Sequence, residues 1–276
     1  MLKLIKLYYQ LISLLSPQLA SKSAFNLFQK VRKKDIRERE QPFYDKASHY
    51  TVKYNKEDLD CYAFGKEHND VVVLIHGWDS NAGSMFGFID QLVANKKRVI
   101  AFNLPGHAFY KAGKTNYLEC KEAFELIIND LAPYDSISFI SHSFGSGVTA
   151  YGLSELDIKV NKLVLLTSPN FVVEIFKDFK AIIGLGDKAF KLMVNTASDL
   201  LGEDVSKVST EDKLQLVNYN GALLIHDKND KIIPYQNTIS INNAIENSSI
   251  ETYENIGHYR MLWNEDVIKK SVEFVL

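Results

Sequence analysis

Residues 136–145, SISFISHSFG, combine a short apolar run with a serine that stands between small residues. The run Ser136–Ser141 predicts a strand, and a helix is expected to begin at Gly145. Ser143 would then occupy a sharp strand-to-helix turn, which needs a small residue two positions to either side. Ser141 and Gly145 meet that need, so the stretch predicts a nucleophile elbow with Ser143 as the attacking residue. An ordinary surface-turn serine is the alternative interpretation.

Strand-like runs and helix-length segments alternate on both sides of this turn. From the third strand onward the alternation predicts an α/β fold with a mostly parallel sheet and helices on both faces. The first two strands, joined by Asn55–Asp58, are expected to form an antiparallel hairpin at the sheet edge. The eight predicted strands are Tyr50–Tyr54, Leu59–Phe64, Val71–His76, Arg98–Asn103, Ser136–Ser141, Lys162–Thr167, Ala222–His226 and Ser249–Tyr253, and the main helices are Gly83–Ala94, Leu118–Leu131, Gly145–Leu153, Gln236–Ala244 and Glu265–Val275.

One connection is too long for a simple crossover, because about fifty residues separate the sixth strand from the seventh. Its apolar residues are spaced for amphipathic helices, with a break at Gly184 and Gly186. We therefore expect three parts: a helical extension over 1–40, a core over 41–168 and 220–276, and an inserted helical lid over 169–219.

The lid is expected to roof the site above Ser143, because small-molecule pockets are mainly apolar. The residues predicted to face an acyl chain are Phe171, Phe176, Phe179 and Met193. The alternative for each is that it only packs against its neighbours and the sheet.

Polar residues directly follow the predicted strands, where ligands of an open parallel sheet bind. A serine nucleophile needs a histidine base and an acid that orients it, in the chain order Ser, Asp, His. Asp230 and His258 satisfy that order, and Asp227 is the rival acid. The histidines expected to orient loops instead are His76, His107, His142 and His226.

Together these motifs resemble the α/β-hydrolase superfamily over residues 48–276, and within it lid-bearing bacterial serine hydrolases with a basic N-terminal helical extension. The matching residues are His76-Gly77-Trp78, Asn103-Leu104-Pro105-Gly106-His107, the Ser143 elbow, Asp230 and Gly257-His258. The resemblance implies an oxyanion hole formed by the backbone N–H groups of Trp78 and Phe144. Ser141 and Asn103 depart from the superfamily pattern, which usually has glycine and an acid at these positions.

The predicted function is hydrolysis of an ester or thioester of a small or apolar acyl substrate, through an acyl-enzyme on Ser143. No cofactor and no metal are expected, since neither a metal-ligand cluster nor a phosphate-binding loop is visible. The alternatives are a binding protein on a hydrolase fold that lacks turnover, and a membrane-peripheral lipid hydrolase or an acyltransferase.

Composition and charge restrict the classes of function that the protein can have. The 276 residues are 46% hydrophobic and 24% charged, as in a globular protein, and the formal net charge of −2 does not favour nucleic acid as a partner. Cys61 and Cys120 cannot form a disulfide framework, so a cytoplasmic, reducing location is expected.

The N-terminal extension is an exception to the even charge balance. Residues 1–39 hold nine basic and two acidic side chains, a local balance of +7. The apolar run Leu7–Leu15 is interrupted by Gln10 and Ser13 and is too short to span a bilayer. We expect a retained amphipathic helix pair here rather than a cleaved signal peptide, packed on the main domain, with attachment to an anionic membrane surface as the alternative.

Overall fold

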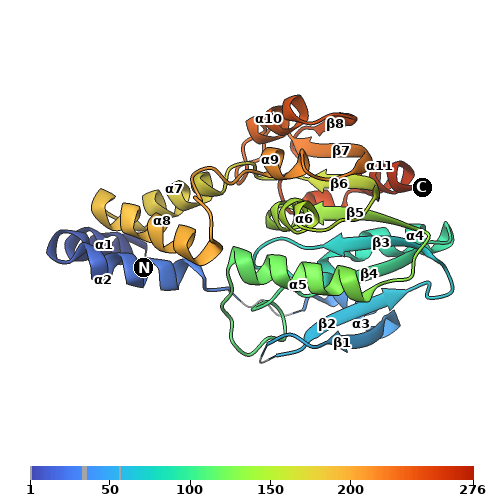
Figure 1. Cartoon of the computed structure of the whole chain (residues 1–276), viewed down its shortest axis with the longest axis horizontal. Coiled ribbons are helices and arrows are strands. Elements are labelled where there is room, and N and C mark those ends of the chain that lie inside the picture. Colours follow the sequence, from blue (N-terminus) through green and yellow to red (C-terminus); the bar gives the residue numbers. More distant parts are fainter. Residues whose placement is uncertain (1, 33–35, 56) are drawn as a thin grey trace.

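The computed structural model describes residues 2–32, 36–55 and 57–276, so the basic residues Lys33 and Lys34, with Asp35, lie outside the described part of the extension. Within those ranges an eight-stranded sheet has the order β1-β2-β4-β3-β5-β6-β7-β8 (Figure 1). Its strands are β1 (Ser48–Val52), β2 (Leu59–Phe64), β3 (Asp70–Ile75), β4 (Arg98–Phe102), β5 (Ser136–His142), β6 (Val160–Leu166), β7 (Tyr219–Asp227) and β8 (Ser248–Tyr253). Each overlaps its predicted strand.

Strand pairing follows the sequence prediction. The strands from β3 to β8 pair in parallel, whereas β1 with β2 and β2 with β4 are antiparallel. In the sheet centre, Leu74 of β3 lies between Ala101 of β4 and Ile140 of β5. Both faces of such strands are covered, which explains their almost continuous apolar sequence.

Helices cover the two faces of the sheet, as predicted. One face packs against α5 (Tyr117–Asp130), α6 (Phe144–Ser154) and α10 (Gln236–Ala244), and the other against α3 (Gln41–Lys46), α4 (Ile89–Ala94) and α11 (Glu265–Val275). The predicted helix Gly83–Ala94 begins instead as a 3₁₀ segment, η2 (Ala82–Phe88), before α4. Two shorter 3₁₀ segments are η1 (Glu38–Glu40) and η3 (Arg260–Trp263).

The long connection between β6 and β7 contains α7 (Val172–Ile183), α8 (Asp187–Leu201) and α9 (Thr210–Leu214), and the N-terminal extension forms α1 (Leu2–Leu15) and α2 (Pro17–Phe28). We call α1, α2, α7 and α8 the cap. Figure 1 shows the cap beyond one end of the sheet, the end at which β6 leads toward α7.

The cap has a hydrophobic core of its own. Buried side chains from all four helices meet there, with the Phe28 ring centroid 4.4 Å from that of Phe176 and 5.1 Å from that of Phe179. The extension was expected to pack on the main domain, but it packs on α7 and α8, whose apolar faces need a partner. The buried members of this core are Tyr9, Ala20, Ala24, Phe176, Ile183, Leu185, Ala189, Met193, Ala197 and Val205.

The turn between α7 and α8 lies against α1. Gly184 ends α7 in the left-handed conformation at φ 73°, as the predicted break requires. The N–H of Gly186 donates to Ser13 Oγ at 3.0 Å, and a Cβ on Gly186 would lie 2.8 Å from Ser13 Cβ. A side chain at residue 186 would therefore push α1 away. None of the helices in the described ranges is both long and apolar enough to cross a membrane.

Phe176→Ala is expected to destabilise the cap, because it removes a buried ring packed on Phe28. A loss of about 3–5 kcal/mol is typical for a buried phenylalanine truncated to alanine. Thermal unfolding followed by circular dichroism measures it. The matched control is Ile182→Ala, which truncates an exposed side chain of the same helix. Equal melting temperatures for the two variants would contradict the packing role of Phe176.

Candidate active site

Three side chains from distant parts of the chain form one hydrogen-bonded row. His258 Nε2 lies 2.9 Å from Ser143 Oγ, and His258 Nδ1 lies 2.7 Å from Asp230 Oδ2. Ser143 follows β5, Asp230 follows β7 and His258 follows β8. With the Nδ1 proton donated to the carboxylate, Nε2 is free to accept the proton of the serine hydroxyl.

Asp230 is held as a carboxylate in this row. Its Oδ1 accepts the backbone N–H groups of Ile232 at 2.7 Å and Ile233 at 3.2 Å. Burial favours the neutral acid, but His258 and these two N–H groups outweigh it and lower the pKa of Asp230 below its ordinary value. The acid therefore presents a negative charge to the imidazole at neutral pH.

The elbow around Ser143 is strained, as the sequence predicted. Ser143 has φ 54° and ψ −124°, and its N–H donates to the Leu166 carbonyl at 2.9 Å. A Cβ on Gly145 would collide with the carbonyl oxygen of His76, so glycine is needed there. Ser141 instead lies in β5 opposite Ile75 and Leu165, without a positive φ, so a small side chain replaces glycine without strain.

His76 orients the peptide that joins Gly77 to Trp78. Its Nδ1 donates to the Gly77 carbonyl at 2.7 Å and its Nε2 accepts from the Leu104 N–H at 3.0 Å. Because a trans peptide is planar, the Trp78 N–H must point to the opposite side from that carbonyl. Burial, followed by the neighbouring His107, holds the pKa of His76 well below its ordinary value, so the ring stays neutral and keeps this role.

The same peptide lies beside Ser143. A Cβ on Gly77 would be 3.1 Å from Ser143 Cβ, which shows how closely the two loops approach. Phe144 opens α6, and backbone N–H groups in the first turn of a helix have no partner within that helix. The N–H groups of Trp78 and Phe144 thus belong to two backbone segments that flank Ser143.

The remaining strand-end histidines orient loops, which confirms the prediction for them. His142 Nε2 donates to the carbonyl of His258 at 3.0 Å, and burial lowers the pKa of His142 to about 3. His226 links Thr238 Oγ1 to the Ile233 carbonyl. His107 Nδ1 lies 2.9 Å from the Pro105 carbonyl.

Asp227, the rival acid, holds the loop that leads to His258. Its carboxylate accepts the backbone N–H groups of Asn229 at 2.8 Å, Asn255 at 3.1 Å and Gly257. Burial favours the neutral acid, yet these N–H groups lower the pKa of Asp227 below its ordinary value. Asp230, and not Asp227, contacts the imidazole of His258. Asp227 instead binds backbone N–H groups of the loop before His258, a role that the sequence did not reveal.

The loop after β3, which contains Trp78, is bound to the extension and to the residue after β4. Asp79 has a φ of 57°. Its carboxylate accepts two hydrogen bonds from Arg32, one from the backbone N–H at 2.7 Å and one from Nε at 2.8 Å. Asn103, where the superfamily commonly has an acid, accepts the Ala82 N–H at 2.9 Å. An amide oxygen is sufficient for that contact, which explains why the acid is dispensable.

Aromatic rings surround the row, a feature that sequence reasoning missed. The Trp78 and Phe144 ring centroids are 5.1 Å apart, edge to face, and Tyr117 lies 5.7 Å from Phe144. Tyr259 packs edge-on to His258 at 5.0 Å. The available signal was an aromatic residue directly after each of Gly77, Ser143 and His258.

The four predicted pocket residues separate into two groups. Phe171 is partly exposed and precedes α7, next to a bridge with Ser209. Phe176, Phe179 and Met193 instead belong to the cap core, packed with α1 and α2. The expectation that these three face an acyl chain is not supported, because a substrate there would have to displace the extension.

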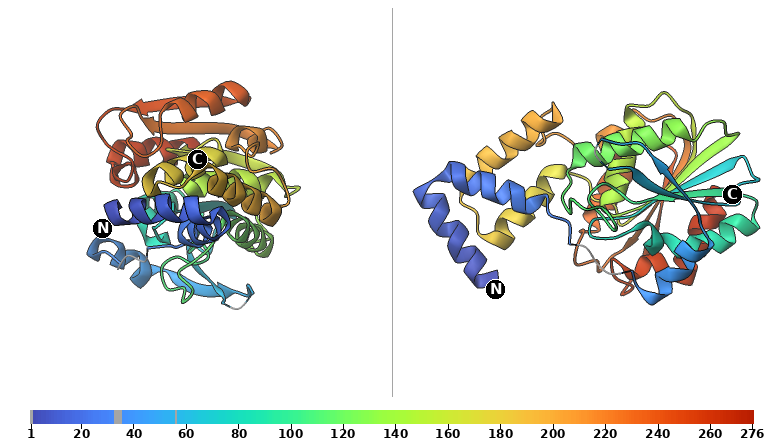
Figure 2. Two further views of the ribbon diagram at one scale, coloured as in Figure 1. Left: turned by 90° about the vertical axis from the view of Figure 1, so that its left-hand side faces the viewer. Right: turned by 90° about the horizontal axis from the view of Figure 1, so that it is seen from below.

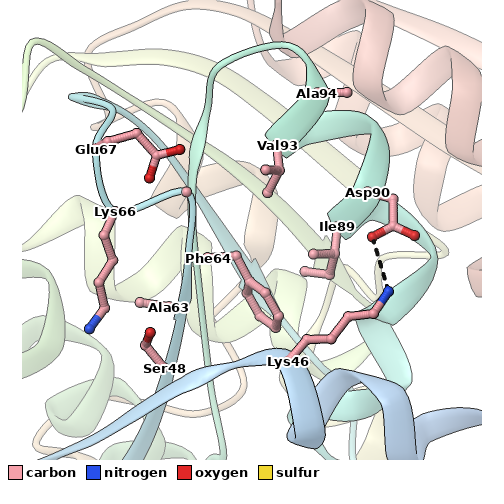
Figure 3. A pocket seen from close by; sticks show the side chains of 11 residues that line it. Lys46, Ser48, Ala63, Phe64, Lys66, Glu67, Ile89, Asp90, Val93 and Ala94 are labelled. Carbon is pink, nitrogen blue, oxygen red and sulfur yellow. Dashed lines mark ion pairs between the residues drawn. The ribbon is translucent and has the colours of Figure 1, made fainter.

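A surface pocket of about 540 Å³ lies elsewhere in the molecule (Figure 3). It is lined by residues at the end of β2, the start of β1 and α4, including the ion pair of Lys46 with Asp90 at 3.9 Å. The end of β2 pairs with the start of β4, so this pocket lies near the amino ends of the parallel strands. Ser143 lies at their carboxyl ends. In the described part of the chain no group of three or more His, Cys, Asp or Glu side chains is placed to hold a metal ion.

Asp227→Asn is expected to lower stability in a pH-dependent manner. Because the folded pKa is below the ordinary value of about 3.9, the carboxylate stabilises the fold above about pH 4, and that contribution is lost as pH falls through the folded pKa. Melting temperatures at pH 7 should differ by the equivalent of about 1–3 kcal/mol. The difference should shrink toward pH 3. The control is Asp157→Asn at an exposed carboxylate; a pH-independent deficit would refute the charge-based role.

Comparison with known proteins agrees with this architecture. Residues 70–191 match the family model described as the alpha/beta hydrolase fold. A 2-hydroxy-6-oxo-6-(2'-aminophenyl)hexa-2,4-dienoic acid hydrolase from Metapseudomonas resinovorans is 24% identical over 242 residues, 74% of this chain and 83% of that protein.

Two solved structures from different organisms share this fold. The Pyrococcus furiosus esterase Pf2001 superposes with a TM-score of 0.68 at 14% identity, over 89% of this chain and 98% of that one. Est1E from Butyrivibrio proteoclasticus, with ferulic acid bound, gives 0.64 at 14% identity, over 82% and 99%. By its sheet order, its elbow and these likenesses, the chain has the α/β-hydrolase fold, and residues 70–191 are similar to the family of that name.

Proposed function

We propose that the protein is a serine hydrolase that cleaves a carboxylic ester or thioester of a small or apolar acyl group. The observation that carries the proposal is the position of His258 between Ser143 and Asp230, with hydrogen-bond distances on both sides. A serine on a strained elbow with a base and an orienting acid is the arrangement that activates a hydroxyl for acyl transfer.

The first half-reaction forms the acyl-enzyme. Ser143 Oγ attacks the acyl carbon while His258 Nε2 takes the hydroxyl proton, and the carbonyl oxygen becomes an oxyanion. The N–H groups of Trp78 and Phe144 are the proposed donors to it, and one such donor commonly contributes about 3–4 kcal/mol. The tetrahedral intermediate then expels the alcohol or thiol, which takes the proton back from His258.

The second half-reaction restores the enzyme. Water attacks the acyl-enzyme, gives its proton to His258, and the carboxylic acid leaves as Ser143 recovers its hydroxyl proton. Asp230 keeps the same imidazole nitrogen protonated throughout. Transfer to an acceptor other than water would use the same first half-reaction, so an acyltransferase is the second outcome of this chemistry.

The relatives support the ester class by what their names state. Pf2001 is named an esterase, Est1E was solved with ferulic acid bound, and the relative from Metapseudomonas resinovorans is a hydrolase of a dienoic acid. The aromatic residues Trp78, Phe144 and Tyr259 around the row are consistent with an apolar acyl group.

Ser143→Ala is expected to abolish ester hydrolysis, by on the order of 10³-fold or more, while the protein stays folded. The substitution removes the attacking oxygen and changes the packing little. A panel of p-nitrophenyl esters of increasing acyl length measures the rate. A fluorophosphonate probe should label the wild type and not the variant. A wild type that takes up no probe would indicate a binding protein without turnover and would contradict the proposal.

Asp230→Asn should reduce kcat/KM far more than Asp227→Asn, because only Asp230 contacts the imidazole. Loss of the orienting carboxylate costs about 10³–10⁴-fold in serine triads. Asp227→Asn should cost less than about 10-fold at a temperature where it is folded, since it acts through the loop. The reverse ranking would move the role of the acid to Asp227.

A further inference from the structure

Helix α1 has two apolar faces, and only one of them is covered. Ile5, Tyr9 and Ile12 pack into the cap core. The opposite face is exposed along the whole helix, and Leu14 and Leu15 at its end are 84% and 85% exposed. The side chains of this surface, which we call the leucine face, are Leu4, Leu7, Tyr8, Leu11, Leu14 and Leu15 of α1 with Leu19 of α2.

The leucine face is a continuous stripe rather than scattered residues. Leu4, Leu7, Leu11 and Leu14 recur at spacings of three and four, which places them along one side of a helix. Figure 2 shows α1 at the outside of the cap, with the sheet beyond the opposite side of the cap. Exposed apolar stripes of this kind in a folded protein mark an interaction surface.

The two helices that form the leucine face carry positive charge. Lys3 and Lys6 of α1 and Lys22 of α2 are exposed, and neither helix contains an aspartate or glutamate. Lys3 stands one helical turn before Leu7 of the stripe. Long lysine side chains can lay their methylene groups on an apolar surface and extend the ammonium group to an anionic headgroup.

The charge favours a lipid surface over a second copy of this chain. A two-fold dimer through the leucine face would bring the lysines of both copies together, with no acidic side chain from α1 or α2 to pair with them. An anionic bilayer offers both an apolar interior for the leucines and phosphates for the lysines.

We propose that the leucine face of the cap docks on an anionic membrane surface, with α1 lying in the plane of the interface. The leucines enter the boundary between headgroups and acyl chains, and Lys3, Lys6 and Lys22 contact the phosphates. Docking is a property of the outer face of the cap and does not require the hydrolase activity proposed above.

Co-sedimentation of the chain of residues 1–276 with vesicles tests this inference. The wild type should sediment with vesicles of equimolar phosphatidylglycerol and phosphatidylcholine. A much smaller fraction of the protein should sediment with vesicles of phosphatidylcholine alone. Leu4→Ser/Leu11→Ser/Leu15→Ser should lower the partition coefficient on the order of 100-fold, because three leucines no longer leave water. Lys3→Glu/Lys6→Glu should lower it about 10-fold or more, and added salt should weaken wild-type binding.

Matched controls separate docking from folding and from catalysis. Leu216→Ser changes an exposed leucine outside the cap and should bind as the wild type. Ser143→Ala should also bind as the wild type, so a failed hydrolase assignment would leave this result unchanged. All of the substituted cap residues are exposed, so melting temperatures should match the wild type.

Three outcomes would overturn the proposal. The first is a wild type that does not sediment with the anionic vesicles, and the second is a triple-serine variant that sediments as well as the wild type. The third is a wild-type dimer that binds no vesicles and that the triple-serine variant converts to monomers, because the occupant of the leucine face would then be a second copy.

Discussion

The imidazole of His258 connects Ser143 and Asp230, which lie 115 and 28 residues away along the chain. Both hydrogen bonds exist only if the loops after β5, β7 and β8 reach the same edge of the sheet. The parallel order β5-β6-β7-β8 provides this, because parallel strands place their carboxyl ends together. The position of His258 therefore depends on the register of four strands and on the loops that follow them.

Several buried polar groups hold that ring in place rather than taking part in the proposed chemistry. Asp227 clasps the loop before His258 through backbone N–H groups, and His142 binds the carbonyl of His258 itself. On the other side of Ser143, His76 sets the direction of the Trp78 peptide. Burial lowers the pKa of both His76 and His142, and the neutral ring suits His76 because a neutral imidazole can accept on one nitrogen and donate from the other. The strain at Ser143 is thus surrounded by contacts that over-determine it.

The cap is held together by a hydrophobic core that is separate from the core of the sheet. Helices α7 and α8 leave the sheet and carry apolar faces that the sheet does not cover, and α1 and α2 cover them. The extension is also tied to the site, because Arg32 binds Asp79 directly after Trp78. A segment that looks like an appendage in the sequence therefore completes one hydrophobic core and contacts the loop that carries a proposed oxyanion donor.

Local patterns in the sequence were sufficient to predict the class of fold, the elbow and the chain order of Ser143, Asp230 and His258. Local signals are sufficient for these, since β-branched runs, helix periodicity and the small residues around Ser143 act within a few positions. The loop-orienting histidines were also predictable, because most histidines that follow strands form structural hydrogen bonds with nearby loops.

Only the tertiary structure decided which acid meets the imidazole and what the apolar residues of 169–219 pack against. Asp227 and Asp230 are three residues apart and both follow the same strand, and their roles differ because β8 brings Gly257 to one and His258 to the other. Phe176 and Met193 showed by their spacing that they would be buried, but apolar periodicity does not specify the partner. Hydrophobic burial is non-directional, so the choice between a substrate and helices α1 and α2 depended on contacts between segments far apart in the chain.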